Sequence, residues 1–210
     1  MILAGGKSSR MGEDKAMISI EGIPLIRQIH DTIAECQSDS QSLTRNIYIV
    51  TPWVAKYQST LPATCQFILE TQPHQGPIIG FEQGLSQIES TWVLLLACDL
   101  PNLSTSVIRS WIDKLSEVAP ETSAYLPRNP HGKGWEPLCG FYRRSCLESL
   151  GEYINAGGNS FQGWLAANDV TELMVPDRQI LFNCNTPADL SAVIQCRSQS
   201  SSEQSEIGCE

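Results

Sequence analysis

The sequence predicts an α/β fold: a three-layer, doubly wound, mostly parallel sheet with helices on both faces. The first observation is a set of short, continuous apolar runs of strand length, at 1–4, 47–50, 67–69 and 92–97. The second is that segments with helical or turn character separate these runs. Strands that are apolar throughout are typical of parallel sheets that are buried on both faces.

The other elements are predicted from their own periodicity and capping residues. Pro24 suits the first turn of a helix, and Leu25, Ile29 and Ile33 then recur at helical spacing to about Cys36. Further helices are predicted over 78–88, 104–115, 145–155, 160–167 and 187–196, and further strands over 124–126, 138–142, 170–175 and 180–182. The segment from 197 onward is rich in Ser, Gln and Glu, which is typical of disorder. We therefore expect one domain over 1–196 and a disordered C-terminal tail over 197–210.

Composition excludes several classes of protein. The formal net charge of −9 argues against nucleic-acid binding, because neutralisation of phosphates dominates that affinity. No apolar run approaches the roughly 18 residues of a membrane-spanning helix, and no signal peptide fits the N-terminus, so we expect a cytoplasmic protein without a membrane partner. The eight cysteines are scattered, with no CxxC or zinc-type spacing, which favours free, buried thiols.

The N-terminal loop has the residues of a phosphate-binding site. Residues 3–15 read LAGGKSSRMGEDK, so a strand ends in two glycines whose amides can approach a phosphate closely. Lys7, Arg10 and Lys15 bring three cations into the same loop, as a triphosphate requires. Neither GxxxxGK[ST] nor GxGxxG fits the spacing, and an ordinary basic surface turn remains the simpler alternative.

This loop resembles the signature LAGGxSxRMGxDK of the molybdenum cofactor guanylyltransferases. The resemblance continues in register to about Ile194 through GPxxG at 76–80, CDxP at 98–101, EPL at 136–138 and NxNTP at 183–187. It implies a Rossmann-like nucleotidyltransferase fold of the nucleotide-diphospho-sugar transferase type. Members usually carry several residues before LAGG, so the first strand is expected to be short here.

The resemblance implies the transfer of GMP from GTP to molybdopterin, with release of pyrophosphate and formation of molybdopterin guanine dinucleotide. Mg²⁺ would be the cofactor, and GTP, molybdopterin and molybdoenzymes or other cofactor-biosynthesis proteins would be the partners. Two alternatives stay open: a cytidylyl- or other nucleotidyltransferase acting on a related phosphate acceptor, and a non-catalytic nucleotide- or cofactor-binding protein.

Asp99 is the predicted metal ligand. It follows the most apolar strand, where ligands bind in open parallel sheets, and a carboxylate there suits a hard divalent ion. A simple turn cap before Pro101 is the alternative. The matching Asp binds Mg²⁺ in the family that the chain resembles, while Cys98 beside it is interpreted as a packing residue. The predicted catalytic residues are Arg10, Lys15 and Asp99, and the predicted nucleotide-binding residues are Leu3, Ala4, Gly5, Gly6, Lys15, Glu70 and Asp99.

Other polar positions are candidates for contacts with phosphate or with the acceptor. They are Gly76, Arg128, Lys133, Asn183 and Asn185. A helix-start turn at 76–77, a solvated loop at 128–134 and an Asx turn before Pro187 are the competing interpretations. Two departures from the family pattern concern the base: Thr51 stands where the family often has Asn, and the loop after Glu70 is about one residue shorter.

Overall fold

The structure is a computed structural model that describes residues 1–5, 14–38, 46–73, 75–130 and 132–206 of the 210-residue chain. Side chains are described for these residues except 37–38 and 198–206. Lys7 and the predicted site residues Gly6 and Arg10 lie outside the described part of the chain. Within that part, no helix is both long and apolar enough to span a membrane.

One sheet organises the molecule, with strand order β5-β4-β1-β6-β8-β7-β9. Its strands β5, β4, β1 and β6 are mutually parallel, β8 is antiparallel to both β6 and β7, and β9 is parallel to β7. The strands are β1 (Ile2–Leu3), β4 (Tyr48–Thr51), β5 (Gln66–Leu69), β6 (Trp92–Ala97), β7 (Ala124–Leu126), β8 (Cys139–Arg143) and β9 (Val170–Glu172). A separate hairpin joins β2 (Ser19–Ile20) and β3 (Ile23–Pro24) through a turn at 21–22, where both residues have positive φ.

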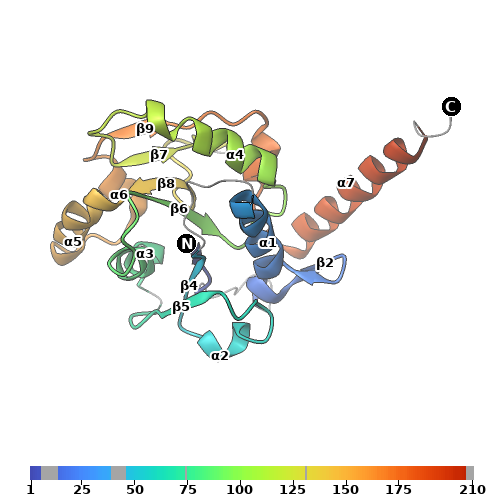
Figure 1. Ribbon diagram of the computed structural model, residues 1–210, viewed down its shortest axis with the longest axis horizontal. Helices are drawn as coiled ribbons and strands as arrows, with labels where there is room; N and C mark the ends of the chain where they lie inside the picture. The colour runs from blue at the N-terminus through green and yellow to red at the C-terminus, as the bar shows by residue number, and fades with distance from the viewer. Residues whose placement is uncertain (6–13, 39–45, 74, 131, 207–210) are drawn as a thin grey trace.

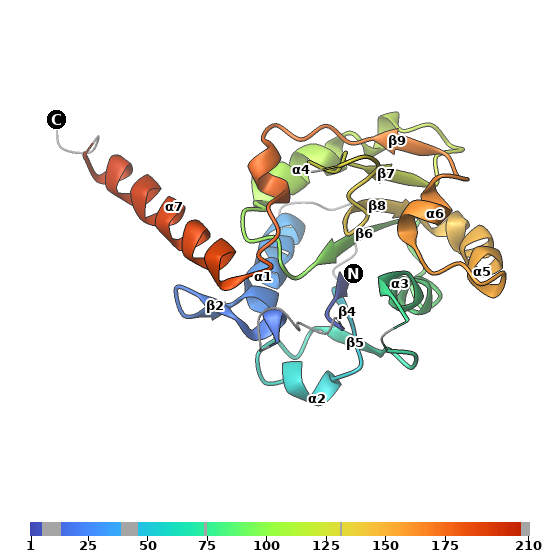
Figure 2. The same cartoon turned by 180° about the vertical axis from the view of Figure 1, so that it is seen from behind.

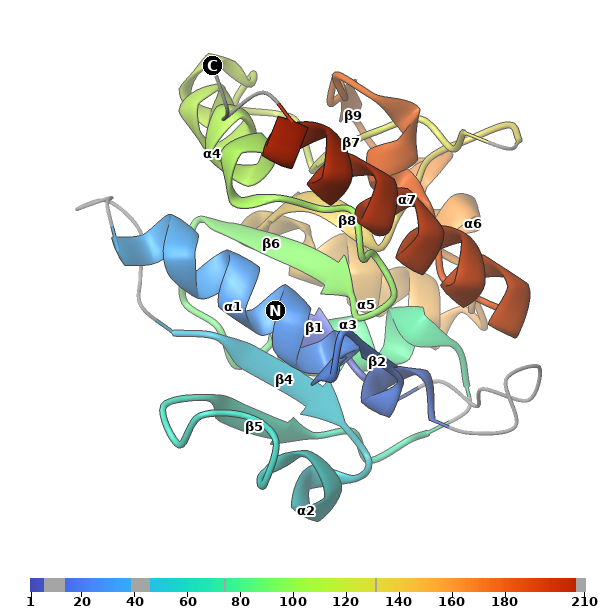
Figure 3. The same cartoon turned by 90° about the vertical axis from the view of Figure 1, so that its right-hand side faces the viewer.

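Helices cover both faces of this sheet (Figures 1 and 3). One face carries α1 (Leu25–Ser38) and α4 (Thr105–Asp113), and the other carries α3 (Pro77–Leu85), α5 (Leu147–Asn155) and α6 (Phe161–Leu165). Alternation along β6 builds the two cores, because Leu94 and Leu96 pack toward α1 and α4 while Val93 and Leu95 pack toward α3 and α5. The predicted doubly wound α/β fold, mostly parallel and with three layers, is confirmed.

Short elements complete the chain. They are α2 (Val54–Tyr57) and the 3-10 helices η1 (Lys15–Met17), η2 (Leu115–Glu117), η3 (Arg144–Cys146) and η4 (Arg178–Leu181). The strand predicted over 180–182 is wrong, because that segment lies largely in η4. Asp177 caps this turn by accepting a hydrogen bond from the Gln179 amide at 2.9 Å, and this local bond stabilises a helical turn over an extended segment.

The last helix also differs from the prediction. It was expected to end at Cys196 before a disordered tail, whereas α7 (Pro187–Glu206) continues and extends away from the sheet layers (Figures 1 and 2). Gln and Glu are good helix formers, and adding a residue to an existing helix costs less than starting one. The composition that predicts disorder therefore also permits this continuation. The extent of the domain, 1–196, stays a prediction.

Candidate functional site

The site lies where the winding of the sheet reverses. After β1 the chain goes to β4 and β5 on one side, and then returns to place β6 on the other side of β1. In open α/β sheets, ligands bind outside the carboxyl ends of the strands at such a point. A cavity of about 490 Å³ opens there, within the usual size range of small-molecule sites. It is lined by Leu3, Ala4, Gly5, Asp14, Lys15, Ala16, Glu70, Gly76, Pro77, Gly80, Ala97, Cys98, Asp99 and Leu138.

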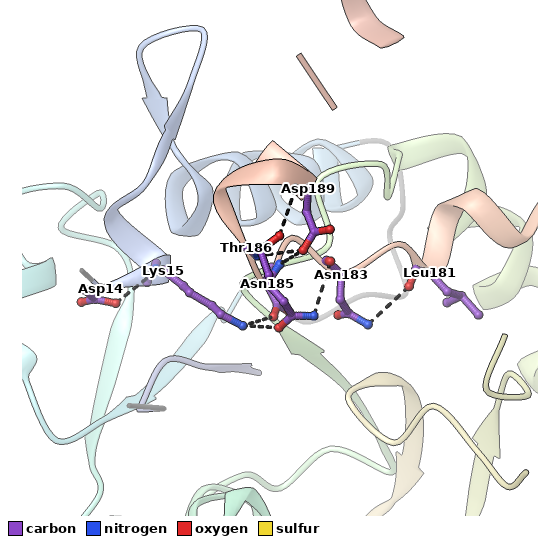
Figure 4. Close-up of polar contacts among 9 residues, drawn as sticks. Asp14, Lys15, Leu181, Asn183, Asn185, Thr186 and Asp189 are labelled. Carbon is purple, nitrogen blue, oxygen red and sulfur yellow. Dashed lines mark hydrogen bonds and ion pairs between the residues drawn. The ribbon is translucent and has the colours of Figure 1, made fainter. Parts of the chain in front are cut away.

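Lys15 and Asp99 form the charged centre of this cavity. The Lys15 Nζ atom lies 3.3 Å from Asp99 Oδ2, and the two side chains are only 20% and 15% exposed. Lys15 Nζ also donates a hydrogen bond to Asn185 Oδ1 across the site (Figure 4). Three predicted site residues, far apart in the sequence, are therefore in contact. A lysine held in this way can present its ammonium charge to a bound phosphate.

Asp14 holds the turn that carries Lys15. One oxygen of its carboxylate accepts a hydrogen bond from the Ala16 amide at 3.0 Å, which caps η1. The other accepts from Tyr57 Oη at 2.6 Å and pairs with Lys56 Nζ at 2.7 Å. Burial, and then the bond to Asp14, raise the pKa of Tyr57, so the phenol stays protonated and donates. The sequence analysis missed α2, which supplies both Lys56 and Tyr57.

Asn185 is held by a capping box at the start of α7. Asp189 Oδ2 accepts hydrogen bonds from the amides of Asn185 and Thr186 at 2.9 and 2.7 Å, and the Asp189 amide donates to Thr186 Oγ1 at 3.2 Å (Figure 4). Burial alone would raise the pKa of Asp189, but the bonds from Asn185 and Thr186 outweigh it and lower the pKa. The cap of α7 is thus formed by Thr186 and Asp189 rather than by an Asx turn of Asn185, whose Oδ1 atom instead accepts from Lys15.

Asn183 forms hydrogen bonds within the same segment, on both sides of it in the sequence. Its Nδ2 atom donates to the Leu181 carbonyl at 3.4 Å, and its own carbonyl accepts from Asn185 Nδ2 at 3.4 Å. Asn183 is not among the cavity-lining residues in the described part of the chain. A direct contact between Asn183 and a ligand therefore gains no support from the structure.

Glu70 forms another wall of the cavity, in a cradle of glycines. It follows β5, its carboxyl group is buried, and burial raises its pKa. A Cβ atom on Gly5 would lie 2.2 Å from Glu70 Oε2, and one on Gly80 would lie 3.3 Å from Oε1. A side chain at position 5 would therefore require the Glu70 carboxyl group to move. The resulting wall presents a carboxylate beside backbone amides.

Gly76 and Thr51 both lie near this wall, but only Gly76 lines the cavity in the described part of the chain. Gly76 lines the cavity at the start of α3 with φ of 102°, a conformation that favours glycine, and Pro77 occupies the first turn. Thr51, in contrast, is fully buried and uses its Oγ1 atom to accept a hydrogen bond from the Trp53 amide at 3.1 Å. The side chain at this departure from the family pattern is therefore used in a local backbone hydrogen bond, and Thr51 is not among the cavity-lining residues of the described chain.

The basic loop at 128–134 does not enter the cavity. Arg128 Nε lies 3.1 Å from Glu172 Oε2, and its guanidinium lies 3.7 Å over the Trp135 ring. Within the described ranges, neither Arg128 nor Lys133 lines the cavity. The predicted contact of Arg128 and Lys133 with the acceptor therefore gains no support from the cavity.

Asp99 fits a divalent cation in one specific way. Its Oδ2 atom faces Lys15, while its Oδ1 atom is buried without a hydrogen-bond partner in the described structure. No group of three or more His, Cys, Asp or Glu in the described ranges could hold a metal by itself. This matches Mg²⁺, which proteins bind through one or two carboxylates together with waters and substrate phosphates. Burial and the charge of Asp99 raise the pKa of Cys98, which makes this thiol a poor nucleophile.

The sheet, its switch point and the Lys15–Asp99 centre define a doubly wound α/β protein whose cavity is suited to a phosphate-bearing ligand. The chain belongs to the family described as the MobA-like NTP transferase domain, whose model matches residues 1–170. It is 52% identical over 195 residues to a probable molybdenum cofactor guanylyltransferase of Trichormus variabilis, covering 93% of this chain and 89% of that one. It is 40% identical over 196 residues to a protein of the same name from Synechococcus elongatus, covering 92% and 96%.

A solved structure supports the fold. The chain is similar to molybdopterin-guanine dinucleotide biosynthesis protein A from Archaeoglobus fulgidus, with a TM-score of 0.72 and 22% identity, over 94% of this chain and 97% of that one. At this identity the likeness concerns the fold alone. It agrees with the predicted Rossmann-like nucleotidyltransferase architecture.

Proposed function

We propose that this protein transfers GMP from GTP to molybdopterin, releases pyrophosphate and forms molybdopterin guanine dinucleotide. The observation that carries the proposal is the Lys15–Asp99–Asn185 centre at the switch point of the sheet. Membership of the NTP transferase family and the names of the relatives at 40–52% identity supply the substrates. Reaction in the cytoplasm and delivery of the product to molybdoenzymes or other cofactor-biosynthesis proteins belong to the same proposal.

Different residues of the cavity are proposed to bind different parts of GTP. The backbone at 3–5 and the start of α3 at Gly76 line the space for the nucleotide, and Glu70 presents a carboxylate to it. Lys15 and Arg10 of the same loop neutralise charge on the phosphates, and the Gly6 amide donates a hydrogen bond to them. Because electrostatic positioning dominates phosphoryl-type transfer, these contacts account for most of the expected rate enhancement. The acceptor phosphate is already ionised at neutral pH, so its attack needs no general base.

Asp99 is the residue proposed to hold Mg²⁺, through its unpartnered Oδ1 atom. When bound, the ion would supply charge neutralisation to the phosphate oxygens of GTP. Asn185 keeps Lys15 beside Asp99, and the capping box keeps Asn185 in place. The protein itself therefore holds the Lys15 ammonium and the Asp99 carboxylate at a fixed distance before GTP binds.

Release of pyrophosphate tests the proposal directly. GTP, ATP, CTP and UTP are compared with Mg²⁺ and molybdopterin, and turnover with GTP alone is expected. Asp99→Asn should lower turnover by about 10²–10³-fold, as loss of a major electrostatic group does, while Asp113→Asn on the exposed end of α4 should not. Turnover with CTP instead would establish a cytidylyltransferase. If GTP protected the protein against thermal unfolding but no NTP was turned over, a binding protein would replace the enzyme.

A further inference from the structure

Glu136 is a half-buried carboxylate that the proposed reaction does not use. It begins the EPL segment at 136–138, just before β8. The backbone around it is fixed, because the Glu136 amide donates to the Pro127 carbonyl at 2.9 Å and Tyr142 Oη donates to the Pro137 carbonyl at 2.7 Å. Its position is therefore set by the fold, although it is not part of any assembled polar network in the described structure.

The register of the sheet places Glu136 beside the metal ligand proposed above. In the antiparallel pair of β6 and β8, Leu96 lies opposite Cys139, and the Ala97 amide donates to the Leu138 carbonyl at 2.8 Å. The chain therefore leaves β6 toward Asp99 at the same edge of the sheet where it enters β8 from Glu136. Leu138 and Asp99 both line the cavity, and although Glu136 is not among the lining residues of the described chain, the register places it opposite Asp99 at this edge.

Lys15 neutralises one oxygen of Asp99, but Asp99 Oδ1 and the Glu136 carboxyl group are left for a further cation. The pKa of Glu136 is raised to about 7, first by burial and then by the negative charge of Asp99. Within the described part of the chain, the Glu136 carboxyl makes no hydrogen bond or ion pair, and Asp99 Oδ1 has no partner either. Lys15 pairs with Asp99 only through Oδ2, so a cation or a proton beside Oδ1 and Glu136 would relieve the repulsion that remains between the two carboxyl groups.

We infer that Glu136 is a second carboxylate of the divalent-cation site, acting with Asp99 when GTP is bound. This inference rests on the proposed function, because it needs the triphosphate to complete the coordination of the ion. One or two carboxylates plus substrate phosphates is the usual way in which proteins bind Mg²⁺. The arrangement also explains why the two carboxyl groups alone do not make a metal site: the nucleotide has to supply the remaining oxygens.

Binding of Mn²⁺, followed by the EPR signal of the free ion, tests this inference without any turnover. The protein is titrated at pH 8 with and without the α,β-methylene analogue of GTP, whose reactive bond cannot be cleaved. We expect tight binding only with the analogue. Glu136→Gln should weaken that binding at least about tenfold, the lower end of the loss typical even for groups that merely support a metal ligand. Glu152→Gln, the same change on the exposed surface of α5, should bind like the wild type.

The outcomes separate the two proposals. If Asp99→Asn loses Mn²⁺ while Glu136→Gln binds it like the wild type, the role of Glu136 is rejected and the proposed function stands. If Asp99→Asn also binds Mn²⁺ normally, the metal site of the proposed function fails. Circular dichroism and the affinity of each variant for the analogue without metal show whether the fold is intact. Should Glu136→Gln not fold, Glu136→Asp is titrated instead, and unchanged Mn²⁺ affinity there rejects the inference.

Discussion

On the side of the parallel strands, charged side chains line the cavity, whereas on the side of β8 and β7 the described cations Arg128 and Lys133 do not. Lys15 and Glu70 line the cavity on the first side. On the second side, Arg128 is bound to Glu172 and stacked on Trp135. The first side is thus preset for a phosphate ligand before the ligand arrives. The second side has cations that would have to give up existing partners.

The two sides also differ in how they are supported. The Lys15 turn is tied through Asp14 to the buried Tyr57, while Arg128 and Glu172 are 55% and 45% exposed. Exposed ion pairs contribute little, and buried charge-assisted hydrogen bonds contribute more. The difference suggests that the parallel side fixes the nucleotide and that the other side adapts to the acceptor. The following substitutions test that contrast, beginning with the largest expected effect.

Lys15→Met should have the largest effect. It removes the ammonium that faces Asp99 and leaves that carboxylate without its partner. We expect kcat with GTP to fall about 10²–10³-fold, in line with the loss of one transition-state donor. Lys114→Met, at the exposed end of α4, serves as the control. Steady-state kinetics that gave the same kcat for both variants would remove Lys15 from the centre of the site.

Gly5→Ala should damage stability and nucleotide binding together. The new Cβ would lie 2.2 Å from Glu70 Oε2, so the buried carboxyl group has to move. Overpacking of this kind costs about 1–3 kcal/mol, which thermal or urea unfolding can measure. Glu70→Asp shortens the facing side chain, so the double variant should be more stable than the sum of the single effects predicts. If the changes in the free energy of unfolding were strictly additive, a steric conflict between the new Cβ and Glu70 would be excluded.

The fold could be predicted further than the site, for a physical reason. Apolar runs and helical periodicity report which face of an element is buried, and they predicted the sheet and most of its helices. The placement of Asp99 in the site followed from the rule that ligands bind at the carboxyl ends of strands, whereas its ion pair with Lys15 was not predicted. The contact of Tyr57 with Asp14 could not be predicted, because α2 is too short to show periodicity. The 3-10 turn at 178–181 was missed because a single capping Asp decided it.

Tyr57→Phe isolates the support of the Lys15 turn. The ring stays buried, and only the hydrogen bond to Asp14 is lost. A bond to a charged group contributes about 1.5–3 kcal/mol, so the free energy of unfolding should fall by up to that amount. Because Lys15 then loses part of its fixed position, KM for GTP should rise more than kcat falls. An unchanged KM with lowered stability would limit Tyr57 to a structural role.

Glu136→Gln should change the pH dependence of stability. In the metal-free protein, held with a chelator, the folded-state pKa of Glu136 is about 7, above the ordinary glutamate value of 4.5. The folded state therefore binds the proton more tightly, and stability is lost as the pH rises through 7. The variant lacks this titration, so it should match the wild type near pH 4 and exceed its melting temperature at pH 8. If the difference in melting temperature between the variant and the wild type stayed constant from pH 4 to pH 8, the raised pKa of Glu136 would be contradicted.

Arg128→Ala should have the smallest effect, and it should affect the acceptor rather than GTP. The loss of an exposed ion pair and of a cation–π contact costs about 1 kcal/mol or less each. Because Arg128 does not line the cavity, KM for GTP should stay within about twofold of the wild type, while KM for the acceptor rises if the loop turns toward it. Lys133→Ala separates charge from loop structure, since it removes a cation without touching Glu172 or Trp135. A tenfold rise in KM for GTP in either variant would erase the distinction between the two sides, because the basic loop would then bind the nucleotide as Lys15 does.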